Sequence, residues 1–183
     1  TEAELVNEFS TIQLSTRTPV QGRILVLSLG SDEISDLSGS FGPWMIRFYH
    51  DDGRYVGLVG SYALADPTVY TLTVEGRSSD RQVIRHSDNL VLSSGDYGYE
   101  SIVLSANKTG LLSPTKTVSE QQMVSAVVTA ETQDRLWDGV FRVPAAGYIT
   151  SSFGTRRSFN GGPYNSYHGG VDFSSLAGPS IFA

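Results

Sequence analysis

The stretch RILVLSL, residues 23–29, decides the fold class of the first half of the chain. Its leucines stand at every second position, which is the spacing that puts side chains on one face of a β-strand. Ile24 and Val26 make the opposite face apolar as well. Because a strand that is apolar on both faces is typical of a sheet interior, this stretch predicts a central strand.

The period of two continues on both sides of this stretch, in short segments separated by turns, from about residue 11 to residue 104. The interval Gly30–Pro43 is polar and glycine-rich and is predicted to be a link. Asp51–Gly53 predicts a hairpin turn, because glycine tolerates positive φ. The further strands that the pattern predicts are Trp44–His50, Arg54–Gly60, Val69–Val74, Gln82–Leu92 and Tyr99–Leu104.

Short strands at this spacing predict an immunoglobulin-like β-sandwich over residues 1–110. A small open barrel is the alternative, because the chain has no cysteine pair to mark an immunoglobulin domain. The expected fold is mainly β. It consists of the sandwich, a linking helix within residues 111–139, and the first strands of a second β-rich domain in residues 140–183.

A helix is predicted after the break at Leu111–Pro114. Thr117 and Glu120 have the spacing of a capping box, in which both side chains accept hydrogen bonds from free N–H groups at a helix start. Apolar residues four positions apart follow. Together these features predict a helix from about Val118 to Glu131 that joins the two domains.

The last part of the chain combines short extended segments with one long loop. Tyr148–Phe153 predicts a strand, and Gly154–Tyr167 predicts a fourteen-residue loop, a length typical of functional loops. The loop leads directly to His168. Because the chain does not begin with Met and ends in the strand-like Pro179–Ala183, we expect it to be an excised part of a longer protein.

Composition limits the kinds of partner. The net charge is −6 and the 13 lysines and arginines are scattered, which argues against nucleic acid, whose binding needs a basic patch. No apolar run approaches the ~20 residues of a membrane span. The chain has no cysteines, so a metal would need nitrogen and oxygen ligands. Nothing in the sequence predicts the oligomeric state.

His168 and Asp172 stand four residues apart, with Gly169-Gly170 between them. On a straight strand they would lie about 13 Å apart, too far for one ion whose bonds are about 2 Å long. They can share a metal only if the chain bends at the glycines, which puts His168 at a loop end and Asp172 on the incoming strand. A turn without a metal is the alternative, because short motifs often match by chance.

The residues around this pair resemble the opening of the lysostaphin-type (LytM-like) zinc endopeptidase domain. The family pattern S-x-F-G-x-R matches Ser151–Arg156, and H-x-G-x-D with a following apolar residue matches His168–Phe173. The family's G-T-P-V-x-A is similar to Gly178–Ala183, where the proline stands one place early. The resemblance covers about residues 141–183, and the β-domain with its helix is similar to the upstream region of secreted members.

The resemblance implies a zinc endopeptidase that hydrolyses peptide bonds in bacterial peptidoglycan, in an extracytoplasmic location (secreted, periplasmic or cell-wall associated). Carried over by position, His168 and Asp172 are two of the three protein ligands of Zn²⁺. The third ligand and a histidine that helps to activate water belong to a later H-x-H motif, which this chain lacks. Residues 140–183 would be the incomplete N-terminal part of a peptidase domain without a catalytic residue. We therefore expect the chain alone to be inactive and to bind zinc poorly.

Arg156 and Tyr167 are candidates for lining the substrate groove, with packing or solvation as the alternative for each. His50 and His86 lie in the β-domain and are not expected to join the metal site. Two other functions stay open. One is a non-catalytic cell-wall regulator with a degenerate peptidase domain. The other is a β-sandwich binding module whose C-terminal part matches the family by accident.

Overall fold

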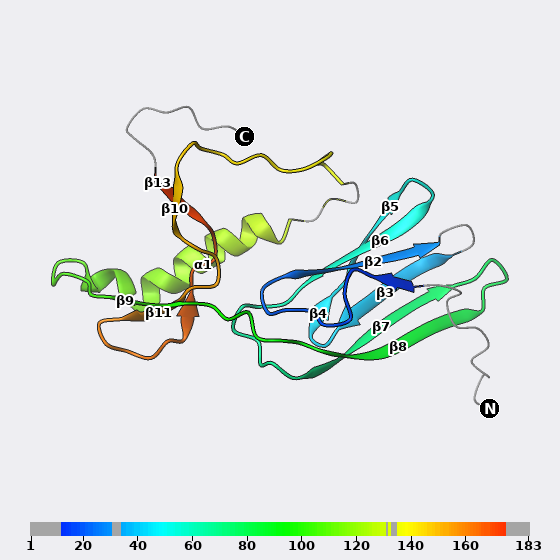
Figure 1. Cartoon of the computed structure of the whole chain (residues 1–183), viewed down its shortest axis with the longest axis horizontal. Helices are drawn as coiled ribbons and strands as arrows, with labels where there is room; N and C mark the ends of the chain where they lie inside the picture. Colours follow the sequence, from blue (N-terminus) through cyan, green and yellow to red (C-terminus); the bar gives the residue numbers. More distant parts are fainter. Residues whose placement is uncertain (1–11, 31–33, 131, 133–134, 175–183) are drawn as a thin grey trace. The chain divides into compact units, whose positions relative to one another are not determined.

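Strand β2 (Ile24–Gly30) lies at the centre of the first sheet in a computed structural model of the chain, which describes residues 12–30, 34–130, 132 and 135–174. The chain forms two units, Thr1–Asp96 and Tyr97–Ala183. Each unit has its own sheets, and most of the elements of both are labelled in Figure 1.

The first unit contains two four-stranded sheets, and every pairing within them is antiparallel (Figure 1). In spatial order, the first sheet consists of β1 (Ile12–Leu14), β2, β6 (Arg54–Gly60) and β5 (Arg47–Asp51). The second sheet consists of β4 (Trp44–Met45), β3 (Ser35–Phe41), β7 (Val69–Arg77) and β8 (Val83–Val91).

One apolar core lies between these two sheets. Leu25, Leu27 and Leu29 of β2 are 2%, 0% and 1% exposed. Leu72 and Val74 of β7, in the other sheet, are fully buried in the same cluster. Because both sheets contribute to one core, the unit is a β-sandwich, and the predicted central position of β2 is confirmed.

The strand order is that of an immunoglobulin-like sandwich. With β1, β2 and β3 as strands A, B and C, and β5 to β8 as D to G, the two sheets read A-B-E-D and C-F-G. Strand β4 adds an edge strand beside C. Val20 and Ser93 also form a parallel bridge within this unit. The prediction of a mainly β fold is therefore confirmed, with a sandwich rather than a barrel.

The prediction of a link over Gly30–Pro43 is wrong, because this interval contains β3. Small residues fit there for a steric reason: a Cβ on Gly39 would lie 2.6 Å from the carbonyl oxygen of Thr73. The hydroxyl of Ser40 lies 3.1 Å from that of Thr73 and is hydrogen-bonded to it. The close contact at Gly39 and the hydrogen bond of Ser40 favour small and polar residues in β3. The strand therefore lacks the apolar alternation by which it could have been predicted.

The prediction of one strand over Trp44–His50 is also wrong. The chain leaves the second sheet after β4 and enters the first sheet at β5, so the segment is divided between the two sheets. Ile46 lies at the crossing and is buried in the core (6% exposed). Burial of Ile46 thus coincides with the place where the chain passes from sheet to sheet.

The second unit contains two small sheets. Strand β9 (Tyr99–Ile102) runs parallel to β11 (Arg156–Phe159), which pairs antiparallel with β12 (Ser166–Tyr167). Strands β10 (Tyr148–Ser151) and β13 (Asp172–Ser174) form an antiparallel pair. The prediction that Tyr99–Leu104 belongs to the sandwich is therefore wrong, because β9 pairs with β11.

The prediction of a single loop over Gly154–Tyr167 is wrong as well, because β11 and β12 occupy much of it. The turn that remains starts with Asn160 and Gly161, whose φ angles are 53° and 77°. The side-chain oxygen of Asn160 accepts a hydrogen bond from the backbone N–H of Leu104 at 2.8 Å. This bond fastens the turn to the chain that follows β9.

Helix α1 (Pro114–Val128) confirms the predicted helix, with a different start. Ser113 is the N-cap residue and proline occupies the first turn, where its missing N–H costs nothing. The capping-box prediction is wrong, because Thr117 lies inside the helix and its hydroxyl donates to the carbonyl of Pro114 at 3.1 Å. A short 3₁₀ turn, η1 (Thr109–Leu112), precedes the helix. The helix ends at Val128, before the predicted end at Glu131, which itself lies outside the described residues.

Candidate metal centre

His168 and Asp172 lie where the chain passes from one small sheet to the other. His168 follows β12, which pairs with β11, and Asp172 begins β13, which pairs with β10. The change of partner strand turns the chain at Gly169-Gly170, which is exposed. The predicted bend is thus confirmed, with the histidine at a loop end and the aspartate on the incoming strand.

The bend brings Nε2 of His168 to 3.3 Å from Oδ1 of Asp172. Two ligand atoms with metal bonds of about 2.0–2.2 Å at a tetrahedral angle lie about 3.3–3.5 Å apart. A direct charge-assisted N–H···O hydrogen bond is shorter, at about 2.7–2.9 Å. The separation fits two ligands of one tetrahedral ion, and it also lies within the range of an ion pair.

The other ring nitrogen of His168 faces protein. Nδ1 lies 3.0 Å from the hydroxyl oxygen of Ser151 and 3.3 Å from the carbonyl oxygen of Ser152. A carbonyl oxygen can only accept, so a hydrogen bond to Ser152 places the proton on Nδ1, whereas the Ser151 hydroxyl can bond to either tautomer. In that neutral tautomer Nε2 presents a lone pair toward Asp172, which is the form that binds a metal cation.

The backbone fixes the histidine further. The N–H of Gly154 donates to the carbonyl of His168 at 2.8 Å, and the N–H of His168 donates to the carbonyl of Thr155 at 2.9 Å. The side chain of His168 is 11% exposed, whereas that of Asp172 is 57% exposed. The pair is thus anchored on its histidine side and open to solvent on its aspartate side, as a site with free coordination positions would be.

Ser151 also contacts Arg157, which forms a charged pair with Glu100. The guanidinium of Arg157 donates to Ser151 Oγ at 3.1 Å and to Glu100 Oε2 at 2.9 Å. Glu100 and Arg157 are register partners in the parallel pairing of β9 with β11. Sequence reasoning missed Glu100, because a parallel contact between segments so far apart in the chain leaves no local signal.

The Phe153-Gly154 motif has a packing role. The Phe153 ring lies edge-on to Tyr97 and Tyr167, with centroids 6.1 and 5.8 Å away. Gly154 has φ +84°, and a Cβ there would lie 2.2 Å from the Tyr97 ring. The site therefore needs glycine at this position, both for its backbone conformation and for space.

The two groove candidates lie beside this aromatic cluster. Arg156 and Tyr167 are register partners on β11 and β12, and both are half-buried. The guanidinium carbon of Arg156 lies 5.9 Å from the centroid of the Tyr97 ring, at the outer limit of a cation–π contact. These contacts supply a packing role for each residue, and a role in a groove stays a prediction.

No group of three or more His, Asp or Glu side chains that could hold a metal occurs within the described part of the chain. His50 lies exposed in β5 beside the ring of Tyr55, and His86 lies half-buried in β8. Both belong to the first unit. The third element of the family resemblance, Gly178–Ala183, lies outside the residues that the structure describes.

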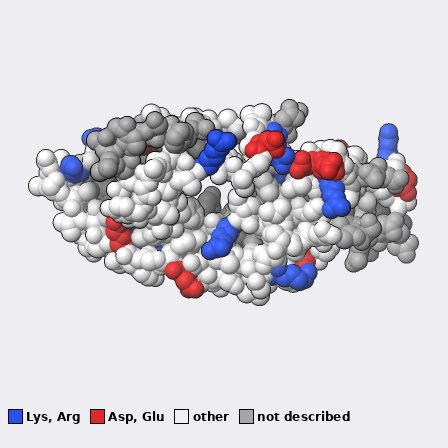
Figure 2. All heavy atoms as spheres, turned by 45° about the horizontal axis from the view of Figure 1, so that its top comes forward, with Lys and Arg blue, Asp and Glu red and all other residues white. Residues whose placement is uncertain are grey.

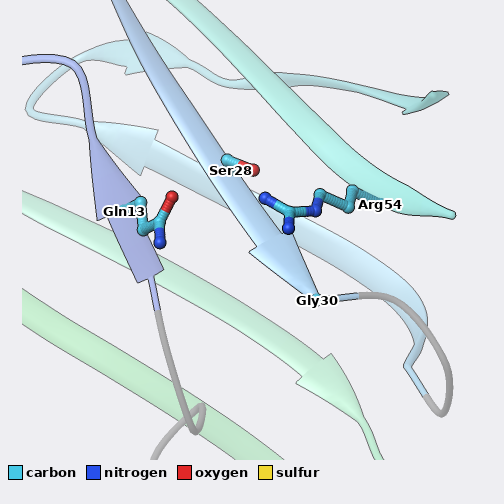
Figure 3. A pocket seen from close by; sticks show the side chains of 4 residues that line it. All are labelled: Gln13, Ser28, Gly30 and Arg54. Atoms are coloured by element: carbon cyan, nitrogen blue, oxygen red, sulfur yellow. The ribbon is translucent and has the colours of Figure 1, made fainter. Parts of the chain in front are cut away.

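The first unit has a polar hollow of about 220 Å³, lined by Gln13, Ser28, Gly30 and Arg54. Figure 3 shows their side chains on neighbouring strands of the first sheet, with the guanidinium of Arg54 close to Ser28. Sequence reasoning did not single out these residues, because polar side chains on the outer face of a strand are ordinary. The hollow is shallow and carries no chemistry of its own.

Charge does not gather into one basic area on the face shown in Figure 2, where basic side chains lie singly or near acidic ones. Within the first unit, Arg17 pairs with Asp88, and Arg85 pairs with Glu75. Among the described residues, no helix is both long and apolar enough to cross a membrane. No family model matches the chain, and a search of curated proteins gives no match.

Proposed function

We propose that this chain contributes to a zinc-dependent endopeptidase that hydrolyses peptide bonds in bacterial peptidoglycan, outside the cytoplasm. The observation that carries the proposal is the pair of His168 and Asp172, whose ligand atoms lie 3.3 Å apart with the other ring nitrogen facing acceptors. The surrounding residues 151–156 and 168–173, with their resemblance to the lysostaphin-type domain, supply the substrate class.

His168 and Asp172 would hold Zn²⁺, with Nε2 and a carboxylate oxygen as its ligands. When bound, zinc lowers the pKa of a coordinated water to about 7 and polarises the carbonyl of the peptide. The chain's own residues supply the geometry. Ser151 and the Ser152 carbonyl hold Nδ1, which leaves the Nε2 lone pair directed outward. Asp172 keeps an exposed side chain, so substrate and water can reach it.

A catalytic zinc has three protein ligands and an open fourth position. The described residues offer two, so the proposal requires a third ligand from outside them. We therefore expect hydrolysis only from a polypeptide in which that ligand is joined to this sequence. The half-exposed carboxylate of Asp172 leaves room for the third ligand to approach.

Release of soluble peptides and new amino groups from purified peptidoglycan would test the proposal in such a polypeptide. We expect activity that a chelator removes and zinc restores, and that His168→Ala and Asp172→Ala both abolish. A His86→Ala control, in the first unit, should keep full activity. If His168→Ala left hydrolysis intact, the proposal would be wrong. If the unsubstituted polypeptide bound the wall but released nothing, the non-catalytic regulator would replace the enzyme.

A further inference from the structure

We propose that Arg157 and Glu100 are positioning residues for the metal pair, acting on His168 through the hydroxyl of Ser151. This inference rests on the proposed zinc site, since it concerns the residues that orient one of its ligands. The inference extends the site to strand β9, which lies outside the family motifs in residues 151–173.

The guanidinium of Arg157 donates hydrogen bonds from two of its nitrogens. Nε donates to Glu100 Oε2 at 2.9 Å, and a terminal nitrogen donates to Ser151 Oγ at 3.1 Å. Because the guanidinium is planar and its donors form a rigid fork, two partners in different directions fix its orientation. The side chain of Arg157 is 21% exposed and that of Glu100 is 43% exposed, so the arginine end of this ion pair is the better shielded from water.

The bond to Glu100 is set by the sheet and not by chance contact. Arg157 and Glu100 are register partners in the parallel ladder between β11 and β9. The ladder continues beyond them, because the N–H of Arg156 donates to the carbonyl of Gly98 at 2.8 Å and that of Asn160 to Ile102 at 2.9 Å. The ladder therefore holds Glu100 directly opposite Arg157.

Ser151, held by Arg157, in turn orients the imidazole ring of His168. Arg157 can only donate, so it occupies one lone pair of Ser151 Oγ and holds that side chain in one rotamer. In this rotamer Oγ lies 3.0 Å from Nδ1 of His168, beside the Ser152 carbonyl at 3.3 Å. The ring then keeps Nδ1 inward and Nε2 toward Asp172. Without Arg157 the hydroxyl is free to rotate away, and Nδ1 loses one of its two hydrogen-bond partners.

Long-range ¹H–¹⁵N NMR on the metal-free chain tests this directly, because it reports which nitrogen of each histidine carries the proton. We expect His168 to carry its proton on Nδ1 in the unsubstituted chain. Arg157→Gln should shift His168 toward a mixture of both tautomers and should weaken binding of added zinc chloride by about ten-fold, as loss of a residue behind a metal ligand typically does. Ser151→Ala removes the same link but keeps the ion pair of Arg157 with Glu100, so it should reproduce both effects.

Arg85→Gln is the matched control. Arg85 and Glu75 are also a cross-strand register pair joined by a salt bridge, but they belong to the first unit. This variant should leave the His168 tautomer and the zinc affinity unchanged. Backbone amide spectra that keep their dispersion in both units would show that each variant is folded.

The inference is overturned if Arg157→Gln and Ser151→Ala both leave the tautomer and the zinc affinity of His168 as they are. It is also overturned if the unsubstituted chain carries the proton on Nε2. These outcomes differ from a failure of the proposed function. If zinc shifted neither nitrogen of His168 while Arg157→Gln still mixed the tautomers, the zinc site would be wrong and the positioning role would stand.

Discussion

Nε2 of His168 lies 3.3 Å from Oδ1 of Asp172, although a straight strand would separate the two residues by about 13 Å. The chain closes this distance by changing its partner strand, from β11 at Tyr167 to β10 at Asp172. The pair is therefore a product of sheet topology and not of a local turn alone. Any change that loosens either ladder should separate the two ligand atoms.

Gly154→Ala should destabilise the second unit strongly. The new Cβ would lie 2.2 Å from the Tyr97 ring, and the residue would keep a φ of +84°. Overpacking and left-handed strain together cost about 3 kcal/mol or more. Amide hydrogen exchange of β11 should report this loss of protection, since the N–H of Arg156 lies in the adjoining ladder.

Gly161→Ala is the matched control for that substitution. Gly161 also has a positive φ, +77°, but a Cβ there would meet nothing within 4 Å. Its cost should be the conformational strain alone, about 1–2 kcal/mol. Equal losses of protection in the two variants would contradict the steric role assigned to Tyr97.

Leu27→Ala should cost the first unit about 2–5 kcal/mol, because Leu27 is 0% exposed and packs in the core between the sheets. Ile24→Ala on the same strand should cost much less, since Ile24 is 63% exposed. Urea unfolding followed by Trp44 fluorescence, in a Trp137→Phe background that leaves one tryptophan, would compare them. Similar midpoints for the two variants would show that the sandwich core is misassigned.

Asp80 should titrate below its ordinary pKa of 3.8, because the Ser78 hydroxyl donates to its carboxylate. A lowered pKa stabilises the folded state above pH 3.8, and that contribution is lost as pH falls through the lower folded value. Ser78→Ala should therefore raise the pKa of Asp80, as carboxyl NMR titration would measure. An unchanged titration curve would mean that this hydrogen bond does not persist in solution.

The sandwich could largely be predicted because its central strands obey one local rule. Apolar side chains alternate along β2, β6 and β7, and the burial of Leu25, Leu27, Leu72 and Val74 follows that alternation. Strand β3 escaped prediction because close packing at Gly39 selects small residues in place of apolar ones. The need for a small residue at Gly39 comes from contacts with the neighbouring strand, which the sequence of β3 alone does not reveal.

The two candidate metal ligands could be predicted from the sequence, but the residues that contact and orient them could not. The glycines between His168 and Asp172 indicated the bend, because two ligands four residues apart cannot otherwise meet. Glu100 could not be found, since its place beside Arg157 depends on a parallel pairing between distant segments. The role of Tyr97 could not be predicted for the same reason, although its ring packs against Gly154 of the motif.

Zinc titration of the chain, followed at the ring nitrogens of its three histidines, tests the metal pair most directly. We predict that zinc shifts Nε2 of His168 and leaves His50 and His86 unchanged. The affinity should be weaker than micromolar, because the described residues supply only two ligands. Asp172→Ala should remove the shift. Submicromolar binding that His168→Ala abolishes would contradict the need for a third ligand, and a His168 signal unmoved by zinc would contradict the metal pair itself.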